Sequence, residues 1–175
     1  MKKWIYGIIL IICICVGGFC AYQAWQIYNE DNEVELQTDK IKKECVEKKN
    51  ENGEQILSPE WGSLKAINPD IVGWIYVPDC AISYPVVQGT NNSYYLDRTI
   101  YKGYNYMGSA FLDCNTNSDF SDDNNIIYGH SVQGGGMFTL LKNFSSKSFF
   151  FSHPVFYLLT PEQNYKCNVF SYSKA

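Results

Sequence analysis

The sequence predicts a mainly β domain, a small barrel or sandwich, with an N-terminal transmembrane helix and short flanking helices. Two observations lead to this prediction. Short runs rich in β-branched and aromatic residues recur from residue 71 onward and are separated by turn residues. An uncharged, strongly apolar run lies near the N-terminus. The chain has 175 residues, which is enough for one domain with its own core.

The uncharged run from Trp4 to Asn29 is long enough to cross a bilayer, which takes roughly 20 helical residues. Lys2 and Lys3 precede it, so we expect a single-pass anchor with a cytoplasmic N-terminus and an extracellular domain. A cleaved signal peptide is the alternative. The length of the run, with no small-residue cleavage site after it, favours an uncleaved anchor. Residues 1–29 are therefore assigned to a cytoplasmic tip and a transmembrane signal anchor.

Residues 30–57 are polar and charged, and Val34, Ile41 and Cys45 recur in them at helical spacing. This pattern predicts a helical stalk. Residues 58–175 are assigned to the β domain.

The β domain is expected to begin with a short helix. Ser58 can cap it, Pro59 suits its first position, and Asn68 lies at its end. The expected strands are residues 71–78, 81–88, 109–113, 124–130, 155–160 and 165–173, with a helical turn at residues 137–144.

Charge and cysteine content narrow the class of protein. The formal charge is −4, which argues against a nucleic-acid partner. Arg98 is the one arginine, so a bidentate clamp on an oxyanion has a single possible donor. There are seven cysteines, three of them in the anchor. The other four can form two disulfides or act as free, buried thiols, and the size of the core favours free thiols.

His130 is the strongest candidate for chemistry. It follows the apolar run Ile126–Tyr128 through Gly129, and the glycines at 134–136 come soon after. Placement at the end of a strand fixes the backbone and leaves the ring exposed, and imidazole shuttles protons near neutral pH. The glycine loop is expected to admit an extended peptide. A surface histidine at a β-turn is the alternative.

The remaining residues offer His130 no obvious partner. His153 is 23 positions away and has no ligand at the usual short spacing, so no metal site and no cofactor are predicted. His153 is expected to end a helical turn before Pro154. Cys80, Cys114 and Cys167 lack the small or hydroxyl neighbours that build an oxyanion hole, so they are interpreted as structural.

From residue 68 onward the sequence resembles the class B sortases, membrane-anchored cysteine transpeptidases of Gram-positive bacteria. The matching segments follow in family order and spacing, and the anchor and stalk agree with the family layout. These segments read NPDIVGWI, YPVVQG, NNSYYLD, GSAFLD, IIYGH and MFTLLKNF. The resemblance implies a sortase-like β-barrel.

The resemblance also implies a mechanism. A cysteine thiolate attacks the threonine carbonyl in the C-terminal sorting signal of a secreted protein, and an amine of the peptidoglycan peptide resolves the thioester. The partners would therefore be such secreted proteins, the cell-wall amine and the membrane. His130 matches the catalytic histidine, the general acid and base. Asn92, Leu96 and Tyr128 match positions lining the sorting-signal groove; core packing is the alternative for Leu96 and Tyr128.

The sequence departs from the family where the nucleophile belongs. No Thr-Leu-x-Thr-Cys strand occurs in the 175 residues, and Arg98 lies too far upstream to match the family's arginine. The chain is therefore expected to be an incomplete sortase barrel that is inactive by itself. One alternative is a non-catalytic anchored domain that binds sorting-signal or wall peptides, and another is a hydrolase that uses Cys80 or Cys114. DNA encoding the missing cysteine and arginine after codon 175 would favour a fragment. The sorting motif, the client protein and the attacking amine are not specified by the sequence.

Overall fold

The structure is a computed structural model that describes residues 2–51, 54–78, 80–132 and 135–174. Gly134, the first position of the predicted glycine loop, lies outside the described residues. The elements in chain order are α1 (Lys2–Cys45), β1 (Val46–Glu51), β2 (Glu54–Pro59), α2 (Trp61–Ile67), β3 (Ile71–Val77), β4 (Ile82–Val87), η1 (Tyr94–Leu96), β5 (Ala110–Leu112), β6 (Ile127–Tyr128), η2 (Phe138–Ser145), α3 (Lys147–Ser152), β7 (Val155–Leu159) and β8 (Asn164–Asn168).

Six of the strands form one sheet, in the order β6-β5-β4-β3-β7-β8. Neighbouring strands are antiparallel except β4 and β5, which are parallel and pair Val86 with Ala110. A parallel pair needs a long crossover, and the segment from residue 88 to 109, which contains η1, supplies it. Each predicted strand overlaps an observed one, and the mainly β prediction is confirmed.

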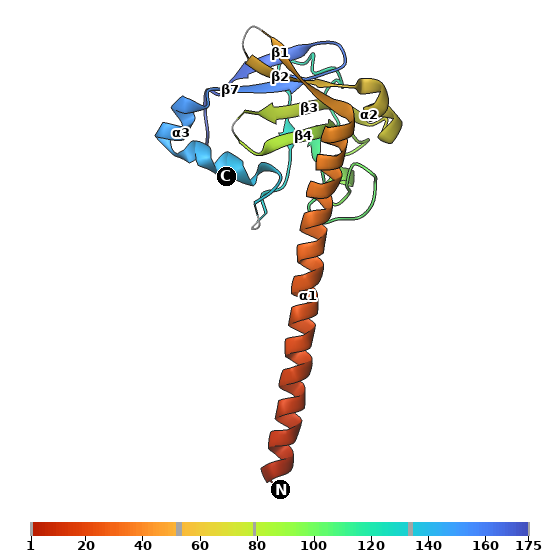
Figure 1. Cartoon of the computed structure of the whole chain (residues 1–175), viewed down its shortest axis with the longest axis vertical. Helices are drawn as coiled ribbons and strands as arrows, with labels where there is room; N and C mark the ends of the chain where they lie inside the picture. Colours follow the sequence, from red (N-terminus) through yellow and green to blue (C-terminus); the bar gives the residue numbers. More distant parts are fainter. Residues whose placement is uncertain (1, 52–53, 79, 133–134, 175) are drawn as a thin grey trace.

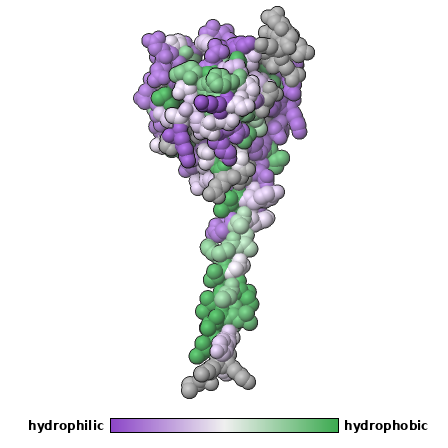
Figure 2. All heavy atoms as spheres, turned by 90° about the vertical axis from the view of Figure 1, so that its left-hand side faces the viewer, coloured by the Kyte–Doolittle hydropathy of each residue, from purple (hydrophilic) through white to green (hydrophobic). Residues whose placement is uncertain are grey.

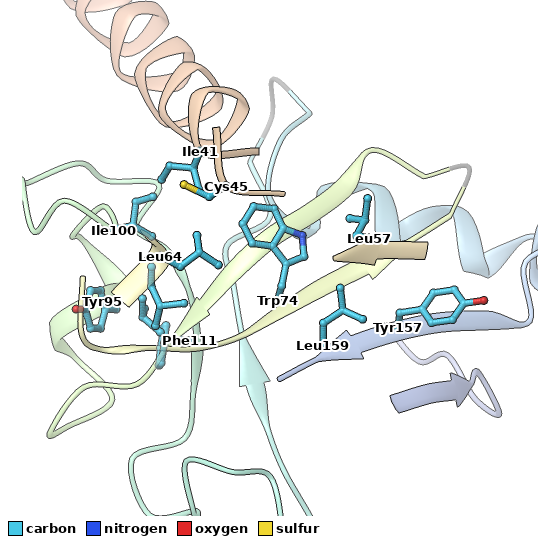
Figure 3. Close-up of a cluster of buried hydrophobic side chains, with 12 residues drawn as sticks. Ile41, Cys45, Leu57, Leu64, Trp74, Tyr95, Ile100, Phe111, Tyr157 and Leu159 are labelled. Atoms are coloured by element: carbon cyan, nitrogen blue, oxygen red, sulfur yellow. The ribbon is translucent and has the colours of Figure 1, made fainter. Parts of the chain in front are cut away.

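The main core lies between α1, α2 and the face of the sheet that they cover (Figure 3). Trp74 of β3 is fully buried at its centre, and its indole Nε1 donates to Ser83 Oγ at 3.0 Å. Ile41 and Cys45 reach it from the end of α1, and Leu64 reaches it from α2. Successive side chains of a strand point to opposite faces of the sheet, and the large apolar ones on this face point toward the helices.

Helix α1 has two parts with different surroundings (Figure 1). The described side chains from residue 4 to 25 are all exposed, and apolar residues cover this part of the helix in Figure 2. From residue 34 onward the helix packs on the sheet domain, with Val34, Thr38 and Ile41 buried. Among the described residues, α1 is the one helix that is long and apolar enough to cross a membrane. A signal sequence near the N-terminus can have the same length and composition.

The segment after α1 differs from the predicted helical stalk. The helix ends at Cys45, and β1 and β2 pair as an antiparallel hairpin, with Val46 opposite Pro59. Pro59 is therefore the last residue of a strand, where its missing N–H costs nothing. Helix α2 begins two residues later than expected, and its cap is Glu60, whose carboxylate accepts from the backbone N–H of Ser63 at 2.8 Å.

Candidate active site

The polypeptide is fixed on both sides of His130. Tyr128 pairs with Phe111 in β5, so β6 ends two residues before the histidine. Gly129 is required at the intervening position, because a Cβ there would lie 2.6 Å from a ring carbon of Phe138. On the other side, the backbone N–H of Phe138 donates to the carbonyl of His130 at 3.0 Å. Phe138 therefore holds the backbone at two neighbouring residues, with its ring against Gly129 and its N–H on the carbonyl of His130.

The imidazole of His130 is half-buried, and its Nε2 lies 2.8 Å from the carbonyl oxygen of Leu96. A carbonyl oxygen only accepts hydrogen bonds, so Nε2 must carry the proton. In the neutral ring, Nδ1 then holds the lone pair and is the nitrogen through which a proton can be exchanged. The structure thus connects two of the predicted site residues, His130 and Leu96, across 34 positions of sequence.

Two more predicted residues meet at the carboxylate of Asp113, directly after β5. The amide Nδ2 of Asn92 and the hydroxyl of Tyr128 both donate to Asp113 Oδ2, each at 2.9 Å. Asn92 Oδ1 also accepts from the backbone N–H of Cys114 at 2.8 Å. Asn92 and Tyr128 are partly exposed, and the ring of Tyr128 stacks on Phe111 with centroids 5.1 Å apart.

Hydrogen bonds at Asp113 shift the pKa values of both Asp113 and Tyr128. The backbone N–H of Asn115, followed by the Tyr128 hydroxyl, holds the pKa of Asp113 below its usual range. The Asp113 carboxylate in turn raises the pKa of Tyr128. Asp113 is therefore a carboxylate and Tyr128 a neutral donor at neutral pH.

Asp113 was not singled out from the sequence, although it connects the two predicted groove residues. The signal was its position at the end of the run SAFLD, where a carboxylate follows a buried strand. Only the pairing of β5 with β6 reveals that Tyr128 lies beside it.

An apolar cavity of about 410 Å³ lies beside β6. Ile127 lines it, whereas Tyr128, the next residue in the strand, stacks on Phe111. Phe138 lines the cavity, and its ring also packs against Gly129, the residue before the histidine. The four predicted site residues are not among the residues that line it.

The other singled-out residues are engaged elsewhere. The ring of His153 stacks on Phe149 with centroids 3.9 Å apart and caps α3. Arg98 forms an ion pair with Asp97 at 2.9 Å. Burial raises the pKa of the Cys80 and Cys167 thiols, which makes both poor nucleophiles. All seven cysteines are free in the structure.

No family model matches the chain. Sortase B of Staphylococcus aureus (strain NCTC 8325) is 31% identical over 173 residues, a match that covers 98% of this chain and 69% of that protein. The chain belongs to the sortase B family. Sortase B of Listeria monocytogenes serovar 1/2a is 36% identical over 122 residues, which cover 70% of this chain. The match spans 49% of the length of that relative.

Solved sortase B structures share the fold. The structure of sortase B from B. anthracis in complex with AAEK1 has a TM-score of 0.71 and 32% identity, and the match covers 84% of this chain and 68% of that one. The Staphylococcus aureus sortase B–substrate complex has a TM-score of 0.68 and 29% identity, with 81% of this chain covered. The predicted sortase-like fold and the class B resemblance are therefore confirmed, whereas the roles of the individual site residues stay predictions.

Proposed function

We propose that this sortase B chain holds the C-terminal sorting signal of a secreted protein beside His130 for transpeptidation to peptidoglycan. The observation that supports this most directly is the imidazole of His130, half-exposed after β6 and held through Nε2 by the Leu96 carbonyl at 2.8 Å. A ring held at one nitrogen keeps the other oriented for proton transfer.

The reaction requires two proton transfers. A thiolate adds to the threonine carbonyl, the C–N bond breaks, and the departing amine takes a proton from the imidazolium. The peptidoglycan amine then attacks the thioester and gives its proton to the imidazole, while the C–S bond breaks and the sulfur leaves as the thiolate, which restores the starting imidazolium and thiolate. Nδ1 of His130 is the atom proposed for both transfers, since Nε2 faces Leu96.

The nucleophile and the oxyanion arginine are not assigned to residues of this chain. Its sequence contains no Thr-Leu-x-Thr-Cys, and Arg98 is paired with Asp97. Without a thiolate the covalent route is closed. The 175 residues by themselves are therefore expected to bind the sorting signal without turning it over.

Asn92, Leu96 and Tyr128 are proposed to contact the peptide. The Asn92 side chain donates one N–H to Asp113 and accepts one hydrogen bond from the backbone of Cys114. Its second N–H and its second lone pair remain available to a peptide backbone. Leu96 is 43% exposed and offers apolar area next to the imidazole that its own carbonyl holds.

Helix α1 is proposed to anchor the domain in the membrane, with the N-terminus in the cytoplasm and the domain outside. The exposed apolar surface of residues 4–25 and the lysines before it support this orientation. Protease added to intact cells should remove the sheet domain and leave α1 protected. Digestion only after lysis would contradict the orientation.

The binding proposal is tested with the full chain in detergent micelles and fluorescent peptides carrying sorting signals of secreted proteins. We expect reversible binding, measured by anisotropy, that Asn92→Ala weakens at least fivefold. Asn168→Ala, at an exposed position of β8, is the matched control and should bind like the wild type. Equal binding by all three proteins would contradict the assignment of the groove.

A thiol-reactive sorting-signal analogue tests the catalytic alternatives. The expected result is no covalent labelling of the 175-residue chain. A label that disappears in Cys114→Ala or Cys80→Ala would instead identify a substitute nucleophile.

A further inference from the structure

We propose that a rigid hairpin of residues 97–105 rests on the lipid headgroups of the membrane that holds α1. The inference depends on the anchoring role proposed above for α1. We name this segment the tyrosine hairpin, after the two exposed rings near its tip, Tyr101 and Tyr104.

The tyrosine hairpin is a built structure. The backbone N–H of Asn105 donates to the carbonyl of Asp97 at 3.0 Å, and that of Thr99 donates to Gly103 at 2.9 Å. Lys102 closes the tip with a left-handed backbone, φ 65°. A segment closed by three backbone bonds presents its side chains in a fixed direction.

The hairpin is attached to α1 at one specific height. The side chain of Asn105 is fully buried, and its Nδ2 donates to the backbone carbonyl of Glu30 at 2.9 Å. Glu30 directly follows the uncharged run of the anchor. Figure 1 shows this part of the crossover between β4 and β5, in green, beside the part of α1 that is nearest the sheet domain.

This height corresponds to the outer membrane interface. Trp25 is the last tryptophan of the apolar run, a residue type that marks the edge of the hydrocarbon. Glu30 lies five positions further along the helix, which is about 7.5 Å at the helical rise of 1.5 Å per residue. The headgroup layer is roughly 5–8 Å thick on each side of a bilayer. The hairpin therefore lies at the outer margin of that layer, within the reach of a tyrosine side chain.

The exposed side chains suit that environment. Tyr104 is 68% exposed and Tyr101 is 44% exposed, although both are large amphipathic rings of the kind that collects at membrane interfaces. The guanidinium of Arg98 lies 5.7 Å from the centre of the Tyr104 ring and stabilises its orientation.

The contact should depend on the rings rather than on charge. Lys102 pairs with Asp70 at 2.8 Å and Arg98 pairs with Asp97 at 2.9 Å, so both cations of the hairpin are already neutralised. The expected partner is therefore the headgroup interface of a zwitterionic bilayer. The hairpin continues directly from Leu96, so this contact would set the height of His130 above the membrane.

The test uses the full chain in phosphatidylcholine nanodiscs that contain a lipid with a nitroxide on its headgroup. A fluorinated phenylalanine replaces Tyr104, Tyr22 or Glu162 in separate samples. Tyr22 lies in the anchor, and Glu162 is exposed in the turn that follows β7. Strand β7 lies at the opposite end of the molecule from the N-terminus (Figure 1). Fluorine line widths are compared before and after the nitroxide is reduced.

We expect the nitroxide to broaden the fluorine signal at positions 104 and 22 at least threefold and to leave position 162 unchanged. Raising the salt from 50 to 500 mM should not alter this result. Broadening at 22 without broadening at 104 would overturn the hairpin contact and leave the anchor intact. Loss of the broadening at 104 in high salt would overturn its basis in the tyrosine rings. No broadening at 22 would refute the anchor itself, and the hairpin contact with it.

Discussion

Two hydrogen-bond networks of the same three residue types, Asn, Tyr and Asp, lie in the sheet domain, and the short helix η1 contributes Tyr95 to one of them. In the inner network, Asn68 Nδ2 donates to the hydroxyl of Tyr95 at 2.9 Å, and that hydroxyl donates to Asp70 at 2.6 Å. In the outer network, Asn92 and Tyr128 both donate to Asp113. The residue types are the same, but the surroundings are not.

The inner network is saturated. Asn68 and Tyr95 are fully buried, and Asn68 also donates to the carbonyl of Ile100 and accepts from the backbone N–H of Asp70. Buried polar groups with all partners in place stabilise a fold but have nothing left for a ligand. The inner network therefore holds η1 in position.

The outer network is partly exposed and leaves hydrogen-bonding capacity on Asn92. The comparison teaches that burial, rather than residue type, separates a network that maintains the fold from one that can recognise a peptide. Substitutions in the inner network should reduce stability, and substitutions in the outer network should reduce binding.

Gly108 packs closely against the backbone of η1, and its substitution is expected to have the largest effect. A Cβ at this position would lie 2.4 Å from the carbonyl oxygen of Leu96, and the residue has φ +59°. The carbonyl oxygen of Tyr95 would lie 2.5 Å from the same Cβ. Because both clashes are with backbone, Gly108→Ala should lower the free energy of unfolding by about 3–4 kcal/mol. Urea unfolding of the full chain in micelles, followed by tryptophan fluorescence, measures this.

Gly103 provides the matched control for Gly108. A Cβ there would meet its nearest atom at an ordinary 3.8 Å, so Gly103→Ala should change the free energy by less than about 1 kcal/mol. If the two alanine variants are equally stable, η1 is not held in the way described.

The two asparagines give the most direct test of the comparison. Asn68→Ala leaves buried partners unsatisfied and should cost about 3 kcal/mol of unfolding free energy. Asn92→Ala removes bonds at a partly exposed position and should cost about 1 kcal/mol, while its peptide binding falls. The same urea titration serves both variants. Equal costs would show that burial does not distinguish the networks.

Much of this fold was predictable from local sequence patterns. The runs that became β3, β4 and β7 are rich in β-branched and aromatic residues, and their limits were predicted to within one residue. The strand expected at residues 165–173 is shorter in the structure, where β8 ends at Asn168. The hairpin of β1 and β2 was not predicted. The sequence VEKKNE of β1 has the charge pattern of an exposed helix, and its pairing with β2 depends on contacts outside the segment.

The candidate site was only partly predictable. His130 was identified because it follows an apolar run, and its neighbours came from the family resemblance. The bond from His130 to Leu96 and the position of Asp113 between Asn92 and Tyr128 join residues 15 to 34 positions apart. Such contacts arise from strand order, which local patterns do not specify.

Removal of single hydroxyls from the tyrosines should have smaller effects. Tyr95→Phe deletes the buried hydroxyl between Asn68 and Asp70, so it should cost about 1–2 kcal/mol. Tyr128→Phe removes a bond at a partly exposed position and should cost less than about 0.5 kcal/mol, although it frees Asp113 and weakens peptide binding. Unfolding midpoints and peptide anisotropy, measured on both variants, should change in opposite order. A larger stability loss for Tyr128→Phe would reverse the assignment of the two networks.

The smallest expected effect is the dependence of stability on pH through Asp70. Burial opposes ionisation of this carboxylate, but the bonds from Lys102 and Tyr95 outweigh it and hold the pKa of Asp70 below its usual value. The folded chain therefore binds fewer protons here than the unfolded chain does. The stabilisation is complete above the unfolded pKa, about 3.9, and is lost as the pH falls through the lower folded value.

Asp70→Asn should flatten the unfolding free energy between about pH 5 and pH 3 relative to the wild type, since the group that titrates there is gone. Asp123→Asn, at an exposed position of the loop before β6, is the control and should keep the wild-type slope. Asp113 also has a lowered pKa, but solvent reaches it, so its share of the slope should be the smaller one. If Asp113→Asn reduced the pH dependence of the unfolding free energy more than Asp70→Asn does, the outer network, rather than the inner one, would stabilise the fold.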